Sequence, residues 1–162
     1  MMTKGTATVT LPADDQLLIT REFAAPRALV WRAWTEPDLV RRWWSGLRGE
    51  VTSVEIDLRV GGTWRYVMVA NEGFEVAFHG EFREIVPNER IVSTEVFEGW
   101  PGGDEDPAIN TVTFVEVDGR TTIEHLSQLS SKEVRDAIMA TGMEDGMQES
   151  WAALERVAIS LG

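Results

Sequence analysis

The chain has 162 residues, of which 43% are hydrophobic and 26% are charged, proportions typical of a single globular domain. Fifteen Lys and Arg stand against 27 Asp and Glu, so the formal net charge is −12. An anionic surface repels nucleic-acid phosphates and acidic lipid headgroups, which argues against nucleic-acid binding and against membrane attachment through basic residues. Residues 1–48 carry seven basic and five acidic side chains, whereas residues 49–162 carry eight and twenty-two.

The residue types also exclude several kinds of site. The chain has no cysteine and two histidines, His79 and His125. Disulfides, cysteine nucleophiles and three-histidine metal sites are therefore excluded, and we expect neither a metal nor a cofactor. No apolar run approaches signal-peptide length near the N-terminus or the roughly 20 residues that span a bilayer. We expect a soluble cytoplasmic protein without membrane insertion.

Seven strands are predicted, following a flexible leader over residues 1–15. No linker interrupts residues 16–162, which are expected to form one domain. Alternating apolar residues and turn signals indicate the strands. They are Gln16–Phe23, Val51–Asp57, Thr63–Ala70, Phe74–Val86, Arg90–Glu98, Ile109–Val117 and Thr121–Leu129.

Two short helices are predicted between the first two strands. Proline favours the first helical turn, so Pro26 indicates a helix over residues 27–35. Pro37 likewise indicates a shorter helix that ends near Trp43-Trp44.

A long helix is predicted at the C-terminus, from Lys132 to about Leu161, because apolar residues recur there at helical spacing. Gly142 and Gly146 lie inside it, and each costs roughly 1 kcal/mol in a helix interior, which indicates a packing or cavity requirement. A helix of about 30 residues, ~45 Å long, covers the face of a sheet but does not fill a strongly curved one. The fold class is therefore predicted to be α+β, with a cavity between sheet and helix.

Several blocks of this sequence resemble a known family. They are ITREFAAPRALVWRAWTEPDLVRRWW (19–44), DLRVGGTWRYVM (57–68), HGEFREIVPNERIVSTE (79–95), NTVTF (110–114) and residues 130–157. Over about residues 16–161 the chain resembles the SRPBCC or START-like superfamily, in the branch of homologues of the activator of Hsp-ninety ATPase. The resemblance implies the helix-grip fold of the birch pollen allergen, a curved seven-stranded antiparallel sheet wrapped around a long C-terminal helix. The superfamily includes lipid-transfer domains, hormone receptors, cyclases and a co-chaperone domain, so fold alone does not define function.

Glu95 and His125 are the candidate catalytic residues. Members of the family often carry aromatic residues at the positions of Glu95 and Phe97, so the strand face that holds both is expected to point inward, and His125 is expected to do the same on its own strand. Burial would shift both pKa values, and such a pair could move a proton on a bound carbonyl compound, as cyclase-like members are thought to do. The alternatives are two polar groups in a wet pocket, or a register error that points one of them to solvent. His79 is expected on the outer face.

Aromatic and methionine side chains form the candidate ligand-binding set, since they offer large, adaptable apolar surfaces. The set is Trp34, Trp64, Tyr66, Met68, Phe78, Phe97, Trp100, Met143, Met147 and Trp151. The alternative is plain core packing. Trp100 lies on the loop Gly99–Pro107, where it is expected to act as a lid or gate, or as a contact in a homodimer.

Two further motifs carry weaker hypotheses. Arg41-Arg42-Trp43-Trp44 has the residue types of a phosphate site with stacking rings, but the motif is typical of the family and the net charge opposes it. Gly61-Gly62 lacks the spacing of a nucleotide-binding loop and is interpreted as a turn.

Three functions remain. The leading hypothesis is a domain that binds a small hydrophobic or aromatic molecule in its cavity. The second is an enzyme of the cyclase, aromatase or dehydratase type, using Glu95, Tyr66 and His125. The third is a co-chaperone-like interaction domain. The two-helix segment is nearly neutral, so if a partner docks, this segment is the expected place.

Overall fold

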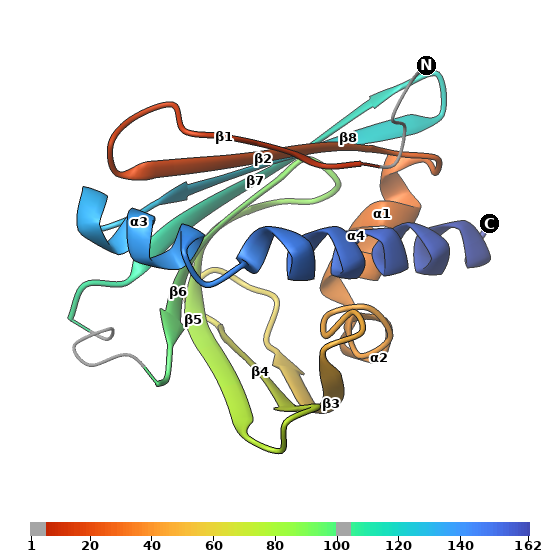
Figure 1. Cartoon of the computed structure of the whole chain (residues 1–162). Coiled ribbons are helices and arrows are strands. Elements are labelled where there is room, and N and C mark those ends of the chain that lie inside the picture. Colours follow the sequence, from red (N-terminus) through yellow and green to blue (C-terminus); the bar gives the residue numbers. More distant parts are fainter. Residues whose placement is uncertain (1–5, 100–104) are drawn as a thin grey trace.

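The computed structural model describes residues 6–99 and 105–162, and the described strands form one antiparallel sheet (Figure 1). The strand order is β1-β2-β8-β7-β6-β5-β4-β3. The bounds are β1 Thr8–Thr10, β2 Gln16–Phe23, β3 Gly49–Ile56, β4 Thr63–Ala70, β5 Glu75–Val86, β6 Arg90–Phe97, β7 Ala108–Val117 and β8 Arg120–Gln128.

The sheet has one strand more than the seven predicted. The additional strand, β1, lies in the segment expected to be a flexible leader, and it pairs with β2 through Val9 opposite Ile19. The side-chain amide of Gln148 also bonds the backbone of Ala7, accepting from its N–H at 2.9 Å and donating to its carbonyl at 2.8 Å. These contacts hold the segment on the domain, although its own sequence has no strand period.

Four helices complete the fold in the described residues: α1 Arg27–Thr35, α2 Pro37–Val40, α3 Lys132–Met139 and α4 Met143–Ser160. The prediction of one helix from Lys132 to Leu161 was wrong, because Gly142 adopts a left-handed conformation (φ 78°) and begins α4. Positive φ is readily accessible to glycine, so Gly142 separates two helices rather than interrupting one. None of these helices is long and apolar enough to cross a membrane.

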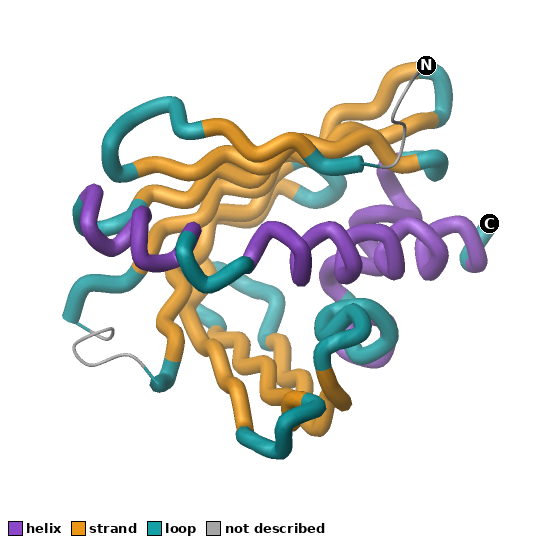
Figure 2. Tube along the Cα trace, viewed as in Figure 1, coloured by secondary structure: helices purple, strands orange, loops and turns teal. Residues whose placement is uncertain are grey.

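The core lies where α4 packs against α1 and one half of the sheet (Figure 2). The Trp151 ring lies 5.8 Å from Phe23 and 5.9 Å from Trp34 between centroids, and Leu154 beside it is fully buried. The indole N–H of Trp43 donates to the Ala33 carbonyl at 2.8 Å. The α1–α2 segment is therefore fixed to α4 largely through tryptophans.

The sheet bends so that its two halves lie on different sides of α4. In Figure 1, β1, β2, β8 and β7 lie on one side, while β4 and β3 lie on the other. Register shifts interrupt the β5–β6 pairing between Phe82 and Glu84 and the β3–β4 pairing between Val51 and Ser53. Such irregularities bend strands and increase their local twist. Because of the bend, α4 covers the sheet incompletely.

Gly80 marks a close approach between strands, and Gly80→Ala tests how much the stability of the fold depends on this close approach. An added Cβ would overlap the Thr94 carbonyl oxygen and lie 2.6 Å from Trp64 Nε1, which itself donates to that oxygen at 3.2 Å. We expect Gly80→Ala to lower the free energy of unfolding by about 1–3 kcal/mol in urea denaturation.

The matched control is Gly146→Ala in α4, where an added Cβ meets no atom within 4 Å. Alanine favours a helix interior over glycine by up to about 1 kcal/mol, so this variant is expected to be at least as stable as the parent. Equal stability of the Gly80→Ala variant and the parent would refute the close-approach argument.

Candidate functional site

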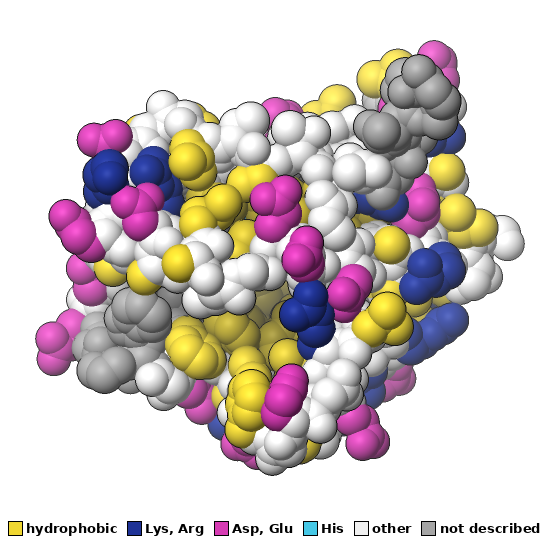
Figure 3. Space-filling model, viewed as in Figure 1, with side chains coloured by type: hydrophobic (Ala, Val, Ile, Leu, Met, Phe, Trp, Pro, Cys, Tyr) yellow, Lys and Arg dark blue, Asp and Glu magenta, His cyan; other side chains and the backbone are white. Residues whose placement is uncertain are grey.

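A cavity of about 770 Å³ lies between the concave face of the sheet and the C-terminal helices. Pockets for small molecules commonly enclose about 300–1,000 Å³. Figure 3 shows a hollow with a hydrophobic interior on the face that carries the α3–α4 junction. The cavity is therefore large enough for an organic molecule of moderate size.

An aromatic cluster forms one wall of the cavity. It consists of Trp64, Tyr66, Phe78 and Phe97 on β4, β5 and β6, together with Trp44 from the loop after α2. Trp44 lies edge-on to Tyr66 and Phe78, with centroid distances of 5.4 and 5.8 Å. Tyr66 lies 4.9 Å from Trp64, and Phe78 lies 5.1 Å from Phe97. Because β4 and β5 bend away from α4, these rings face open space instead of a helix.

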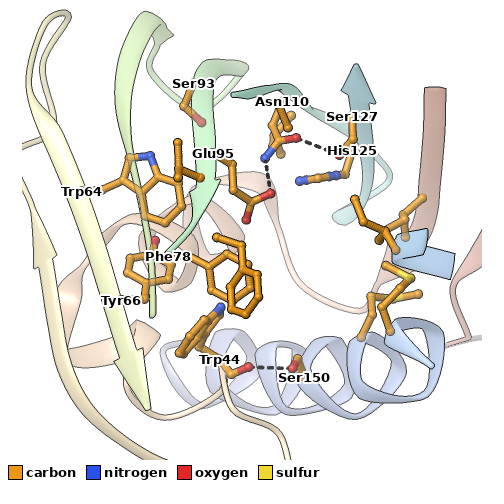
Figure 4. Close-up of a pocket in the computed structure, with 18 of the residues that line it drawn as sticks. Trp44, Trp64, Tyr66, Phe78, Ser93, Glu95, Asn110, His125, Ser127 and Ser150 are labelled. Carbon is orange, nitrogen blue, oxygen red and sulfur yellow. Dashed lines mark hydrogen bonds between the residues drawn. The ribbon is translucent and has the colours of Figure 1, made fainter. Parts of the chain in front are cut away.

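The loop that follows α2 closes the aromatic cluster against α4. Ser150 Oγ donates to the Trp44 carbonyl at 2.7 Å (Figure 4). Arg48 Nε donates to Glu149 Oε1 at 3.2 Å, and the Leu47 N–H donates to the same oxygen at 3.2 Å. The position of Trp44 in the cavity therefore depends on α4.

A row of polar side chains crosses the adjoining wall, on β6, β7 and β8. The strand register places Ser93 beside Asn110, and Asn110 beside Ser127. Ser127 Oγ donates to Asn110 Oδ1 at 2.7 Å, and Asn110 Nδ2 donates to Glu95 Oε1 at 3.1 Å (Figure 4). The two hydrogen bonds give Ser127, Asn110 and Glu95 a fixed arrangement.

Glu95 and His125 lie on the same face of the sheet and line the same cavity. Figure 4 shows both side chains directed into it, from β6 and β8. Burial raises the pKa of Glu95, and the hydrogen bond from Asn110 opposes that rise in part. Burial lowers the pKa of His125 to about 4, so the ring is neutral at pH 7. Both environments favour the uncharged form.

His125 also has a polar atom without a partner. Its Nδ1 is buried and has no hydrogen bond among the described residues. The ring lies 6.3 Å from both Trp34 and Trp151, between centroids. A buried polar atom without a partner costs stability, which distinguishes this nitrogen from an ordinary core group.

The structure places nine residues of the predicted ligand-binding set along the cavity: Trp34, Trp64, Tyr66, Met68, Phe78, Phe97, Met143, Met147 and Trp151. Trp100, the expected lid, lies outside the described residues. What the nine contact when a ligand is present stays a prediction. His79 does not line the cavity, and its Nδ1 lies 2.9 Å from Glu98 Oε2.

The candidate site predicted from the sequence does not include Trp44, Ser93, Asn110 and Ser127, which line the cavity, although Ser93 and Ser127 share the inward strand faces expected for Glu95 and His125. Trp44 was considered only as a stacking ring of the arginine-rich motif. The signal for Asn110 was present, because it alternates with the apolar residues Val112 and Phe114 on β7. A polar residue on the inward face of a strand points to a hydrogen-bonded partner or a cavity.

The described residues contain no group of three or more His, Asp or Glu side chains that could hold a metal ion. The polar lining instead consists of neutral hydroxyl, amide and imidazole groups, the buried carboxyl group of Glu95, and the exposed side chains of Arg48 and Asp106. Their chemistry is hydrogen bonding and proton transfer.

The bent antiparallel sheet around a C-terminal helix defines the helix-grip class of START-like domains. Within this class, the chain belongs to the family described as Activator of Hsp90 ATPase homolog 1-like protein, whose model matches residues 24–158. The resemblance found in the sequence is thereby confirmed. No curated protein matches the chain significantly.

Solved structures of bacterial proteins share this fold. A protein from Rhodobacter sphaeroides is 24% identical with a TM-score of 0.86, and the match covers 95% of this chain and 99% of that one. A protein from Mycobacterium smegmatis is 26% identical, with a TM-score of 0.82 over 93% and 95% of the two chains. A protein from Arthrobacter aurescens is 25% identical, with a TM-score of 0.82 over 94% and 91%. These likenesses establish the architecture but assign no ligand.

The chain has two histidines, so NMR titration tests the cavity position of His125 directly. We expect its imidazole resonance to titrate with a midpoint near pH 4, as burial lowers its pKa to about 4 from an ordinary value of 6.5. Between these values the unfolded state binds more protons, so the free energy of unfolding should fall as the pH drops from 6.5 toward 4.

His125→Phe assigns the resonance and serves as the control. The phenyl ring removes the titrating group while keeping an apolar ring beside Trp34 and Trp151, so the loss of stability over this pH range should become smaller. A midpoint near 6.5 would show that His125 is solvated rather than buried.

Proposed function

We propose that the protein binds a small, largely apolar molecule in the cavity between the sheet and α4. The cavity volume of about 770 Å³, enclosed by aromatic and aliphatic side chains, carries this proposal. Apolar side chains that line a cavity of this size are exposed to water, and an apolar ligand that covers them removes this unfavourable contact. Such a ligand binds the folded state and stabilises it by mass action.

The aromatic cluster and the polar row would together fix the orientation of a bound ligand. The aromatic cluster offers ring faces and edges to the apolar part of the ligand. The row formed by Ser93, Asn110 and Glu95 offers hydrogen-bonding groups to a polar part. Pockets that combine apolar walls with a few fixed polar groups select ligands by orientation as well as by size.

Gly146 provides a test of ligand binding. It lies on the face of α4 that lines the cavity with Met143 and Ser150, and an added Cβ meets no atom within 4 Å. We expect the neutral dye Nile red to bind the parent with increased fluorescence. Gly146→Phe should weaken this binding at least about tenfold, equivalent to 1.4 kcal/mol, because the phenyl ring occupies cavity space.

Gly146→Ala is the control, and it should change the dye affinity by less than about threefold. Thermal unfolding of both variants checks that they are folded. If the parent binds no dye, or if the Gly146→Phe variant binds it as tightly as the parent does, the proposal that this cavity binds a ligand is wrong.

A second candidate function, proton transfer on a carbonyl compound, is favoured by the placement of His125 and Glu95 in the same cavity (Figure 4). At neutral pH the neutral ring has a lone pair that can accept a proton from the carbon next to the carbonyl. Protonated Glu95 can donate its proton to the carbonyl oxygen, which yields the enol, the imidazolium and the carboxylate. The reverse steps regenerate both groups, so no further reactant is consumed.

Hydrogen exchange tests this second function without knowledge of the natural substrate. We expect the parent to accelerate deuterium incorporation next to the carbonyl of 4-phenyl-2-butanone in D₂O, measured by mass spectrometry. Glu95→Gln and His125→Phe should each reduce the enzymatic rate by about a hundredfold, the scale of general acid–base catalysis. Glu124→Gln, on the outer face, is the control. The proposal is wrong if the parent exchanges hydrogen only at the rate of buffer alone, or if Glu95→Gln and His125→Phe exchange it as fast as the Glu124→Gln control does.

A further inference from the structure

Among the described residues, no cation pairs with the carboxyl group of Glu95 in the cavity. Glu95 lines it with a carboxyl group, and Asn110 is its one hydrogen-bond donor among the described residues, through Oε1. Arg48 is the only Lys or Arg that lines the cavity in the described part of the chain. Its guanidinium is held by Glu149 instead, at 3.2 and 3.3 Å. Residues 6–99 and 105–162 therefore supply Glu95 with no cation.

The hydrogen bonds of the polar row run in one direction. Ser127 donates to Asn110, whose amide then donates to Glu95. Both hydrogen bonds of the row are donated toward the carboxyl group of Glu95. They use its Oε1 only, which leaves Oε2 to the ligand. A buried charge requires a paired group, and in this arrangement the pairing group must come from a hydrogen-bond donor on the ligand.

The aromatic cluster lies beside the same carboxyl group. Figure 4 shows Glu95 directed into the cavity, with Trp64, Tyr66 and Phe78 on one side of it and His125 on the other. The faces of Trp, Tyr and Phe rings attract cations as well as apolar groups. A carboxyl group next to several rings therefore suits a positive group attached to a hydrocarbon.

The charged groups around Arg48 are mostly acidic. Arg48 is surrounded by Glu149, Asp145 and Glu72, whose negative charges raise its pKa. Asp106 also lines the cavity. A cavity bordered by more acidic than basic groups raises the local concentration of cations and lowers that of anions.

We propose that the cavity takes an organic amine, whose ammonium group pairs with Glu95 while its apolar part lies against the aromatic cluster. This inference rests on the proposed ligand-binding function and names its ligand class. Carboxylates, including fatty acids, are disfavoured, since they would bring a second negative charge to Glu95. Because burial raises the pKa of Glu95, an ammonium ion is the kind of ligand that restores the charged form.

Three probes with one hydrocarbon skeleton test the inference: 2-(2-naphthyl)ethylamine, 2-(2-naphthyl)ethanol and 3-(2-naphthyl)propionate. Isothermal titration calorimetry at pH 7.5 measures the affinity of each for the full chain. We expect the amine to bind about tenfold to a hundredfold more tightly than the alcohol, the scale of a hydrogen bond to a charged group. The carboxylate should bind most weakly.

Glu95→Gln isolates the charge, because a glutamine oxygen still accepts from Asn110. It should reduce the amine affinity about tenfold or more, while the alcohol affinity changes less than about threefold. Glu124→Gln, on the outer face of β8, changes the net charge equally and should leave both affinities unchanged. Thermal unfolding establishes that each variant is folded.

The pH dependence of amine binding gives an independent readout. Between pH 5 and 8 the amine stays charged, His125 with its pKa of about 4 stays neutral, and burial keeps the Tyr66 hydroxyl protonated by raising its pKa. Glu149 stays ionised, since Arg48 lowers its pKa. Amine affinity should therefore rise with pH as Glu95 loses its proton, whereas alcohol affinity should stay constant.

The outcomes separate the two proposals. If neither Nile red nor any of the three probes binds, the proposed ligand-binding function is wrong. If the alcohol or the carboxylate binds as tightly as the amine, or if Glu95→Gln leaves the amine affinity unchanged, the amine inference is wrong and the ligand-binding function stands.

Discussion

The incomplete contact between α4 and the bent sheet is the constraint on which the rest of the structure depends. Trp151 and Leu154 pack α4 against Phe23 and α1, on the side of the sheet that contains β2 and β8. The sheet bends through β5, so β3 and β4 lie on the other side of α4. A straight helix cannot contact both halves of a bent sheet along its length. The space that remains is the cavity, and the rings of the aromatic cluster line it because no helix reaches them.

The polar row shows how such a space can hold hydrogen-bonding groups without loss of order. Asn110 is buried, yet its carbonyl oxygen and its amide are both used, by Ser127 and Glu95. The bonds fix the orientation of the Glu95 carboxyl group before any ligand arrives, which lowers the entropy cost of binding. His125 differs, because its Nδ1 has no partner in the described residues. The cavity is thus lined by Glu95, which Asn110 orients, and by His125, whose ring lies beside Trp34 and Trp151.

The accuracy of sequence reasoning differed among the elements for identifiable reasons. Thr63–Ala70 and Gln16–Phe23 have the predicted bounds, because their alternation is strong and turn residues flank them. Strand β1 was missed because Gln148 and β2 hold it, both distant in sequence. The break at Gly142 was missed because apolar spacing continues through it, although glycine permits the left-handed conformation found there. Asn110 was overlooked since its two hydrogen-bond partners lie on neighbouring strands.

The sequence by itself determined the α+β class, the family, and the inward periodicity of the strands that bear Glu95 and His125, since these depend on local spacing and on contiguous motifs. Only the tertiary structure decided which rings border a cavity and which form the core. Trp43 and Trp44 are neighbours in the chain, but Trp43 is buried against Ala33 and Trp44 faces the cavity. The tertiary structure also brought Glu95, Asn110 and Ser127 into one row, because strand register alone joins residues so far apart in sequence.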